Sequence, residues 1–513
     1  MSGSIWMPPG SRPDTLPAVP RRRTTPSWAQ PDPLDELAER LDDFIAAAVH
    51  PDEIAALLES DGLSDDQIRE RYGVKNSFAL AEELFERVER RYPEPDGPAH
   101  DPWQVGLLGC LLRGVVFALP GFGYVLGAPL LAGPQGDFGL PAGTVPLLAG
   151  ALTGWTWNQG LAHRAYSWLG LGDRGAARRS LLLGAPAGAL LGALVALVVA
   201  GTAGTFDAAA AAFAAGQSCY LGAATVLLVM GRERALLAAL LPMAAAAVLA
   251  LLHPIPDLAG SALLLGSLLA VAVLAFLEVA PATREWGKGG WTAGLTALLP
   301  FGPYGTAPEG QPERTATPGL TGSLPYALFG LGTGVLVLYA ALGDVLADEG
   351  AGTGAVAAPA AVALTLSMGP AEWLLYRFRS GSLAGLRSSS TPRAFCRTTV
   401  RTVVECLSGY LVALLALSLA TSALWPHAPG VSGVRLAGLL LLGVVLWTGL
   451  LLQSFGAVLS AATICCATAL AQTVALVTHS GSPHGVGLIV HGTAAVAQVV
   501  LVCALLGRAT AHR

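Results

Sequence analysis

Residues 181–201 read LLLGAPAGALLGALVALVVAG, a stretch without a charged side chain. Its length matches the roughly 20 apolar residues that a helix needs to cross the hydrocarbon core of a bilayer. The chain holds about twelve such segments, so the sequence predicts an all-α, polytopic membrane protein. We expect the spans at Gln104–Leu131, Ala142–His163, Leu181–Gly201, Ala208–Met230, Leu236–Leu252, Leu258–Ala280, Ser323–Leu346, Ala355–Tyr376, Thr398–Leu424, Val434–Leu452, Ala457–Thr478 and Gly485–Leu506.

The composition of all 513 residues agrees with this class. Charged residues make up 13% of the chain, hydrophobic residues 53%, and the mean hydropathy is +0.57. Soluble domains carry about 25% charged residues, so this chain has too few to cover a water-exposed surface. A soluble multidomain enzyme is therefore excluded. The 7 cysteines show no CxxC spacing, and we interpret them as buried apolar residues.

The first hundred residues differ from the rest. Residues 1–33 are rich in Pro and Arg, and we predict that they are disordered. Residues 34–99 predict an acidic cytosolic helical domain followed by a proline-rich tether. Ser64 with Gln67 forms a capping-box pattern, and Asn76 opens the next helix. This domain is strongly acidic, which argues against binding to nucleic acid phosphates, so we predict a cytosolic protein partner for residues 34–92.

The arginines determine the expected topology. About fifteen basic residues fall in alternate connections between the spans, whereas the other connections carry essentially one, Arg435. The positive-inside rule then places the N- and C-termini in the cytoplasm of a multi-pass protein in the inner or plasma membrane. The basic residues in question are Arg164, Arg174, Arg178, Arg179, Arg232, Arg234, Arg284, Lys288, Arg314, Arg377, Arg379, Arg387, Arg393, Arg397 and Arg401.

The membrane part divides into two halves of six spans. Lobe 1 covers residues 104–280, a Gly- and Pro-rich cytoplasmic loop covers 281–321, lobe 2 covers 322–508, and a short tail covers 509–513. In each half, the second span ends in aromatic residues and continues into a basic loop. We therefore expect two parallel six-helix lobes with a cleft between them.

Polar groups at depth in the bilayer are the candidate site residues, because burying them in lipid is unfavourable. Arg113 lies about a third of the way along the first span. Arg113 either binds an anionic substrate or has a structural role, in which it pairs with Glu405 or with a helix carbonyl. Gln159 and His163 are four residues apart and share one helix face. The second span also contributes Asn158 and Arg164, as a polar cleft lining or as interhelical hydrogen bonds.

Further candidates lie in later spans. Glu405 is four residues beyond Arg401, which permits a local ion pair, with proton or sodium coupling as the alternative. His491 and Gln498 are seven residues apart on the last span, and Gln217 lies in the fourth. Glu278 and Glu372 lie at the ends of spans, where water can solvate a charge, so we rank them lower.

Enzyme motifs are missing from the sequence. It contains no GxxxxGK[ST], HExxH or GxSxG pattern, so we predict that the chain is not an enzyme and needs no cofactor or metal. Its expected partners are the lipid bilayer and a transported molecule.

Two transporter families resemble the chain. Trp157-Asn158-Gln159-Gly160 and Leu324-Pro325-Tyr326-Ala327-Leu328-Phe329-Gly330, within the two-lobed plan, are similar to the MOP superfamily of flippases, including its Pel-type polysaccharide exporters. This resemblance implies alternating access, ion coupling, and a polysaccharide or lipid-linked sugar as cargo. Gly172-Asp173-Arg174-Gly175, followed by Arg178 and Arg179, is similar to the cytoplasmic loop of the major facilitator superfamily. The sequence thus predicts a secondary transporter or flippase, with a small-solute transporter or a non-transporting scaffold of an envelope-assembly complex as alternatives.

Overall fold

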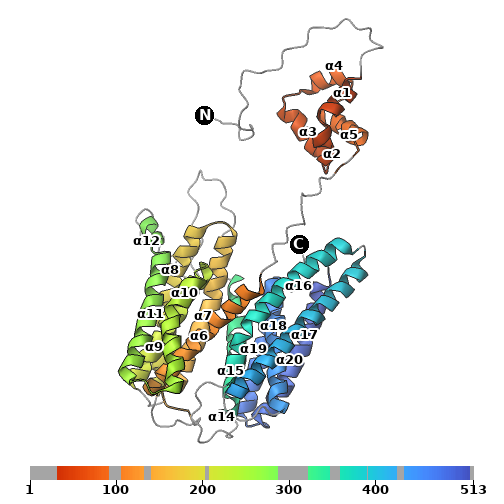
Figure 1. Ribbon diagram of the computed structural model, residues 1–513. Coiled ribbons are helices and arrows are strands. Elements are labelled where there is room, and N and C mark those ends of the chain that lie inside the picture. The colour runs from red at the N-terminus through yellow and green to blue at the C-terminus, as the bar shows by residue number, and fades with distance from the viewer. Residues whose placement is uncertain are drawn as a thin grey trace. The chain divides into compact units, whose positions relative to one another are not determined.

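The computed structural model describes residues 32–89, 91, 106–131, 140–202, 207–286, 322–346, 359–389, 391–424 and 433–508. The elements in these ranges are α-helices. They fall into two compact units, with α1–α5 inside residues 1–100 and α6–α20 inside residues 101–513 (Figure 1). Residues 1–31 of the predicted disordered N-terminus, the tether, most of the inter-lobe loop and the C-terminal tail lie outside the described residues, whereas Asp32 and Pro33 belong to the start of α1.

The N-terminal unit is a small helical domain. Two of its helices begin where the sequence predicts: Ser64 and Gln67 form the expected capping box, and Asn76 accepts a hydrogen bond from the Ala79 N–H. Gly73, with a φ of 74°, ends α4 in the left-handed conformation that glycine adopts without strain. The helices are α1 (Pro33–Arg40), α2 (Asp42–Ala47), α3 (Pro51–Ser60), α4 (Asp65–Tyr72) and α5 (Ser77–Arg87).

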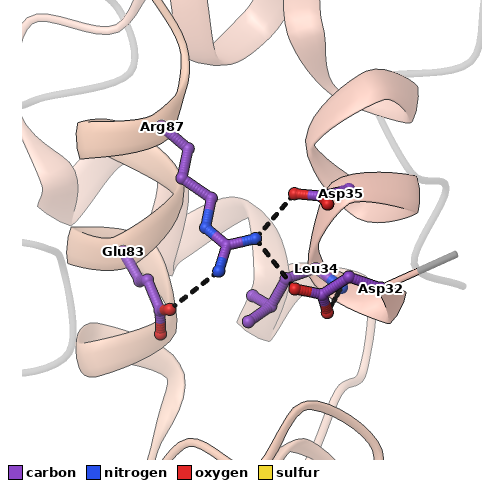
Figure 2. Close-up of polar contacts among 5 residues, drawn as sticks. All are labelled: Asp32, Leu34, Asp35, Glu83 and Arg87. Atoms are coloured by element: carbon purple, nitrogen blue, oxygen red, sulfur yellow. Dashed lines mark hydrogen bonds and ion pairs between the residues drawn. The ribbon is translucent and has the colours of Figure 1, made fainter. Parts of the chain in front are cut away.

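Apolar side chains from all five helices close the core of this unit. Ile45, Ile54 and Ile68 are fully buried, together with leucines from α3 and α5. Arg87 at the end of α5 forms ion pairs with Asp32, the N-cap of α1, and with Asp35 in its first turn, at 3.1 and 2.7 Å (Figure 2). A core of this size is near the lower limit for a domain without disulfides, and ion pairs as exposed as these add little to its stability.

The second unit contains the apolar helices. Its elements are α6 (Leu107–Leu131), α7 (Thr144–Gly170), α8 (Arg174–Thr202), α9 (Ala208–Val229), α10 (Glu233–Leu252), α11 (Asp257–Val279), α12 (Pro281–Trp286), α14 (Leu324–Leu346), α15 (Pro359–Leu366), α16 (Met368–Ser388), α17 (Pro392–Leu424), α18 (Gly433–Ser454), α19 (Val458–Val477) and α20 (Pro483–Leu506).

Ten of these helices are long and apolar enough to cross a membrane, which confirms the multi-pass class. The two predicted spans outside this set are the second of each half. α7 is long but rich in polar and aromatic residues, and its counterpart is divided into α15 and α16 at Ser367. The least apolar helix of each half therefore occupies the same place in the chain order.

The packing of the first six spans recurs in the last six. α6 packs against α10, as α14 packs against α19 six spans later. α9 packs against α11 as α18 packs against α20, and α7 against α8 as α15 and α16 pack against α17. The described helices thus form two similarly connected bundles, lobe 1 (α6–α11) and lobe 2 (α14–α20), on either side of the unit in Figure 1.

Candidate functional site

The two lobes meet along two lines of contact, which we call the seam. The first line joins α6 to α15 and α16. A Cβ atom added at Gly114 would lie 2.8 Å from the Gly369 backbone nitrogen, and one added at Gly369 would lie 2.8 Å from the Cys110 carbonyl oxygen. Only glycine at both positions allows the two backbones to approach so closely.

Arg113 lies on this line beside the glycines. Its guanidinium pairs with Glu372 on α16, and its Nε lies 2.7 Å from Glu233 Oε1 at the start of α10. The Tyr376 hydroxyl donates to Glu372 Oε1 at 3.2 Å. One cation and two carboxylates, each about a fifth to a third exposed, thus connect lobe 1 to lobe 2.

The second line of the seam joins α7 to α14 without formal charge. The His163 ring stacks on Tyr326 at a centroid distance of 3.7 Å, and its Nδ1 lies 3.2 Å from Ser323 Oγ. The Gln159 side chain covers Gly330, one turn further along. Gln159 and His163 therefore share one helix face, as their spacing predicts.

The seam occupies one half of the membrane unit. On α6 its closest approaches lie between Cys110 and Gly114, and on α14 and the residue before it they lie between Ser323 and Gly334. Beyond these points both helices turn to their own lobes: Gly127 of α6 faces Phe213, and the Tyr339 hydroxyl of α14 donates to Thr473 Oγ1 at 2.7 Å. In Figure 1, α6 (orange) accordingly runs obliquely, away from α16 and into lobe 1.

We call the end of the unit where α6 and α14 begin the seam end. The basic segments after α7 and α16 lie at this end, because α7 runs antiparallel to α6, and the divided span α15–α16 runs antiparallel to α14. The positive-inside rule predicts that such basic segments face the cytoplasm. This orientation remains a proposal.

A second charged cluster lies within lobe 1, near the same end. Glu278, with a side chain only 7% exposed, accepts from Arg178 Nη2 at 2.9 Å and from Arg232 Nε at 2.8 Å. Arg174 lies 3.7 Å from the same carboxylate. These contacts join α8, α11 and the turn before α10, so the cluster holds lobe 1 together as one body.

The interior of lobe 2 carries a different set of polar groups. Gln498 is fully buried, accepts from Thr448 Oγ1 at 2.7 Å and donates to Cys465 Sγ at 3.3 Å. His491, one heptad earlier on α20, is 4% exposed, and neither of its ring nitrogens has a hydrogen-bond partner. The two residues share a face, as expected, but only one of them is satisfied.

The remaining predicted residues lie away from the ionic line. Asn158 is buried with its Oδ1 unpaired, Arg164 is half-buried, and Gln217 is half-buried on α9. Glu405 pairs with Arg401 at 2.8 Å on the exposed face of α17, the local pair that the spacing of four permits. The suggested pairing of Arg113 with Glu405 is wrong, because Arg113 is occupied by Glu372 and Glu233.

Sequence reasoning ranked Glu372 and Glu278 low and omitted Glu233 and Tyr376. The partner of Arg113 lies 259 residues later, so spacing along a helix could not find it. One indication was present: an arginine at depth needs a carboxylate, and Glu372 stands within the second span of the other half. No group of three or more His, Cys, Asp or Glu with metal-binding geometry occurs among the described residues.

Comparisons with known proteins identify no family for this chain. No family model matches the sequence, and no curated protein matches it. Among solved structures, the chain is similar to the Vibrio cholerae MATE transporter VcmN in a bent form, with 18% identity, a TM-score of 0.42, and coverage of 78% of this chain and 95% of that chain. A MATE in complex with Br-NRF matches with 13% identity, a TM-score of 0.40, and coverage of 78% and 97%. At this level of similarity, neither structure determines the fold or the cargo of this chain.

Proposed function

We propose that this protein is a secondary transporter whose two lobes move against each other, with a saccharide-bearing amphiphile as cargo. The observation that supports the proposal is the seam: the lobes are joined along one half of the membrane unit, through ion pairs and a stacked ring. Such contacts form and break with modest changes in free energy, whereas an interface that continued the apolar core would hold the lobes permanently together.

The ionic line is suited to act as a latch. Arg113 can exchange Glu372 for water or for cargo without losing all compensation, because Glu233 of its own lobe remains beside it. A cation in the membrane that kept no partner would be strongly unfavourable. Glu233 therefore allows the seam to open at an accessible free-energy cost.

Aromatic and amide groups beside the neutral line support a saccharide-bearing cargo. Trp155 is 46% exposed and lies beside Gly330 and Gly334 on the lobe 2 side. An exposed indole with a neighbouring amide, Gln159, offers an apolar ring face and hydrogen bonds together, as a sugar ring requires. The long apolar helix faces around the seam would accompany a lipid chain.

The test of lobe movement uses a native reporter. Cys110 is 1% exposed at the α6–α16 contact, and maleimide reacts only with a thiolate that water reaches. In a variant that keeps Cys110 as its single cysteine, Glu372→Gln should raise the alkylation rate about tenfold, equivalent to about 1.4 kcal/mol less stable closure. Glu405→Gln is the matched control, because it removes the same charge from an exposed local pair and should leave the rate unchanged.

Equal alkylation rates in the two variants would contradict the latch. A rate that stays at the background level in both would favour the non-transporting scaffold instead. The cargo is tested in a deletion strain assayed for extracellular polysaccharide and lipid-linked sugar, complemented with wild type or Arg113→Ala. Lost polymer that only wild type restores supports saccharide export; unchanged polymer and lipid pools would exclude it.

A further inference from the structure

Lobe 2 contains a buried histidine, His491, that takes no part in the contacts of the seam. His491 lies on α20 between α18 and α19, with both ring nitrogens buried and without a partner in hydrogen-bond geometry. The Gly438 carbonyl of α18 approaches the ring without reaching that geometry. A buried polar group without a partner costs about 1–3 kcal/mol, so its presence in the core calls for an explanation.

A second unpaired group borders the same place. Gln472 Oε1 on α19 is also buried without a partner. A Cβ atom added at Gly487 would lie 3.5 Å from Gln472 Nε2 and 3.9 Å from His491 Cε1, so both side chains flank the position that this glycine leaves open. The helices α19 and α20 thus bring an imidazole and a side-chain amide to the same point.

Gln498 shows what a purely structural polar residue looks like in the same interior. Its carbonyl accepts from Thr448 and its amide donates to Cys465, so its hydrogen bonds are made within the lobe. His491 and Gln472 lack this arrangement. Their ring nitrogens and carbonyl oxygen are therefore able to make further hydrogen bonds.

We propose that His491, assisted by the Gln472 carbonyl, is a proton-binding site that drives the lobe movement; this inference rests on the proposed transport function. The proton comes from water at the end of lobe 2 opposite the seam end and binds the free lone pair of the neutral imidazole. The imidazolium N–H groups then donate to Gln472 Oε1 and to water. Charging His491 in the packed lobe is unfavourable, so the proton binds when water enters between α18, α19 and α20.

The charged and titratable groups around His491 are compatible with a proton that binds in one state of lobe 2 and leaves in the other. α18 contributes Arg435 at this end, α14 contributes Tyr339, and α20 itself contributes His484. The charged residues of α17 lie at its opposite end, and the side chain of Asp344 on α14 is outside the described set. Among the described side chains at this end of lobe 2, Arg435 is the charged residue and none is a carboxylate that would hold a proton on His491, so the proton can leave when water leaves the site.

The test measures the lobe separation as a function of pH in the full chain in lipid nanodiscs. Spin labels at Asp257→Cys in lobe 1 and Ser480→Cys in lobe 2 report the distance across the end opposite the seam, in a background without other cysteines. Wild type should change its distance distribution between pH 8 and pH 5.5 and take up one more proton than His491→Gln in an unbuffered titration. His491→Gln should lose the distance change, whereas His253→Gln, which removes an exposed histidine at the same end, should keep it.

A second variant tests the proposal independently in case His491→Gln does not fold. Gly487→Ala places a methyl group in ordinary van der Waals contact with both side chains, and it should shift the midpoint of the distance change to lower pH by excluding water. A His491→Gln protein that keeps the wild-type pH response, or a wild type without one, would overturn the proton site. If Glu372→Gln still raises the alkylation rate of Cys110 in that case, the transport proposal survives. If neither a change of pH nor Glu372→Gln changes the distance or the alkylation rate, the transport proposal fails as well.

Discussion

Two arginines of this protein both pair with carboxylates, but they lie in very different surroundings. Arg113 on α6 pairs with Glu233 and Glu372, and Arg87 on α5 pairs with Asp32, Asp35 and Glu83. Their side chains are 32% and 33% exposed. Figure 2 shows the second cluster, which lies in the N-terminal unit, whereas the first lies among helices of spanning length.

The difference teaches that the exposed fraction alone does not determine how much an ion pair contributes to stability. The exposed third of Arg87 is in water, which screens the pair and solvates either partner alone. The corresponding part of Arg113 lies within a membrane helix, where a lone charge has little solvation. The same contacts should therefore tie the lobes together in one place and contribute little in the other.

The largest expected effect comes from breaking the membrane cluster. Arg113→Met leaves two carboxylates, Glu233 and Glu372, without their cation, and should destabilise the solubilised full chain by about 2 kcal/mol or more. The measurement is its thermal unfolding midpoint. Arg401→Met is the matched control, because Arg401 is 81% exposed and has one local partner, Glu405. Equal losses in the two variants would show that the membrane setting adds nothing to the pair.

A steric change sharpens the comparison by separating charge from helix contact. Gly114→Ala places a methyl group 2.8 Å from the Gly369 backbone and should cost about 1–3 kcal/mol, because backbone atoms cannot move aside as a side chain would. Gly160→Ala on the neutral line, where the added atom would lie 3.4 Å from Ala327 Cβ, should cost much less. Alkylation of Cys110 and the unfolding midpoint both report the outcome. Similar values for the two variants would place the closest approach of the lobes elsewhere.

The smallest effect is expected in the exposed cluster. Arg87→Met should raise amide exchange in α1 and α5 of the full chain by less than about tenfold, because exposed ion pairs are worth little. Exchange measured by mass spectrometry tests this, and a much larger increase would contradict the comparison.

This small effect should also depend on pH. The pKa of Asp32 is lowered by the Leu34 N–H and then by the Arg87 guanidinium. A folded-state pKa below the unfolded value stabilises the domain above about pH 4 and loses that contribution as the pH falls through the folded value. The difference between wild type and Arg87→Met should therefore shrink below about pH 4. A constant difference across this range would show that Asp32 is not the relevant partner.

Much of the local structure could be predicted. The capping box at Ser64 and Gln67, the left-handed Gly73 and the cap at Asn76 depend on contacts within one or two turns, which the sequence displays directly. The apolar spans follow from length and composition in the same way. The break at Ser367 between α15 and α16 was missed, although Gly369 and Pro370, which follow it closely, are residues typical of a helix break and of the first turn of a new helix.

The candidate site was predicted in part. Arg113, Gln159 and His163 lie at the seam because polar groups at depth in a membrane helix seek other helices. Their partners Glu372, Gly330 and Tyr326 come from the other half of the chain and could not be identified from helix spacing. Glu372 was discounted as a span-end residue, although its helix continues well past it to Ser388.

The sequence by itself determined the class of the protein: its lack of charge and its apolar segments leave the membrane as the environment that satisfies both the backbone and the side chains. It also determined an acidic helical domain ahead of the membrane helices. The tertiary structure alone decided which polar residues meet. Arg113 and Glu372 are 259 residues apart, and His491 and Gln472 lie on different helices, so their meeting depends on how the helices pack. Helix propensity and hydropathy act along the chain within a few residues, whereas the seam and the buried imidazole arise from contacts between helices that no local rule orders.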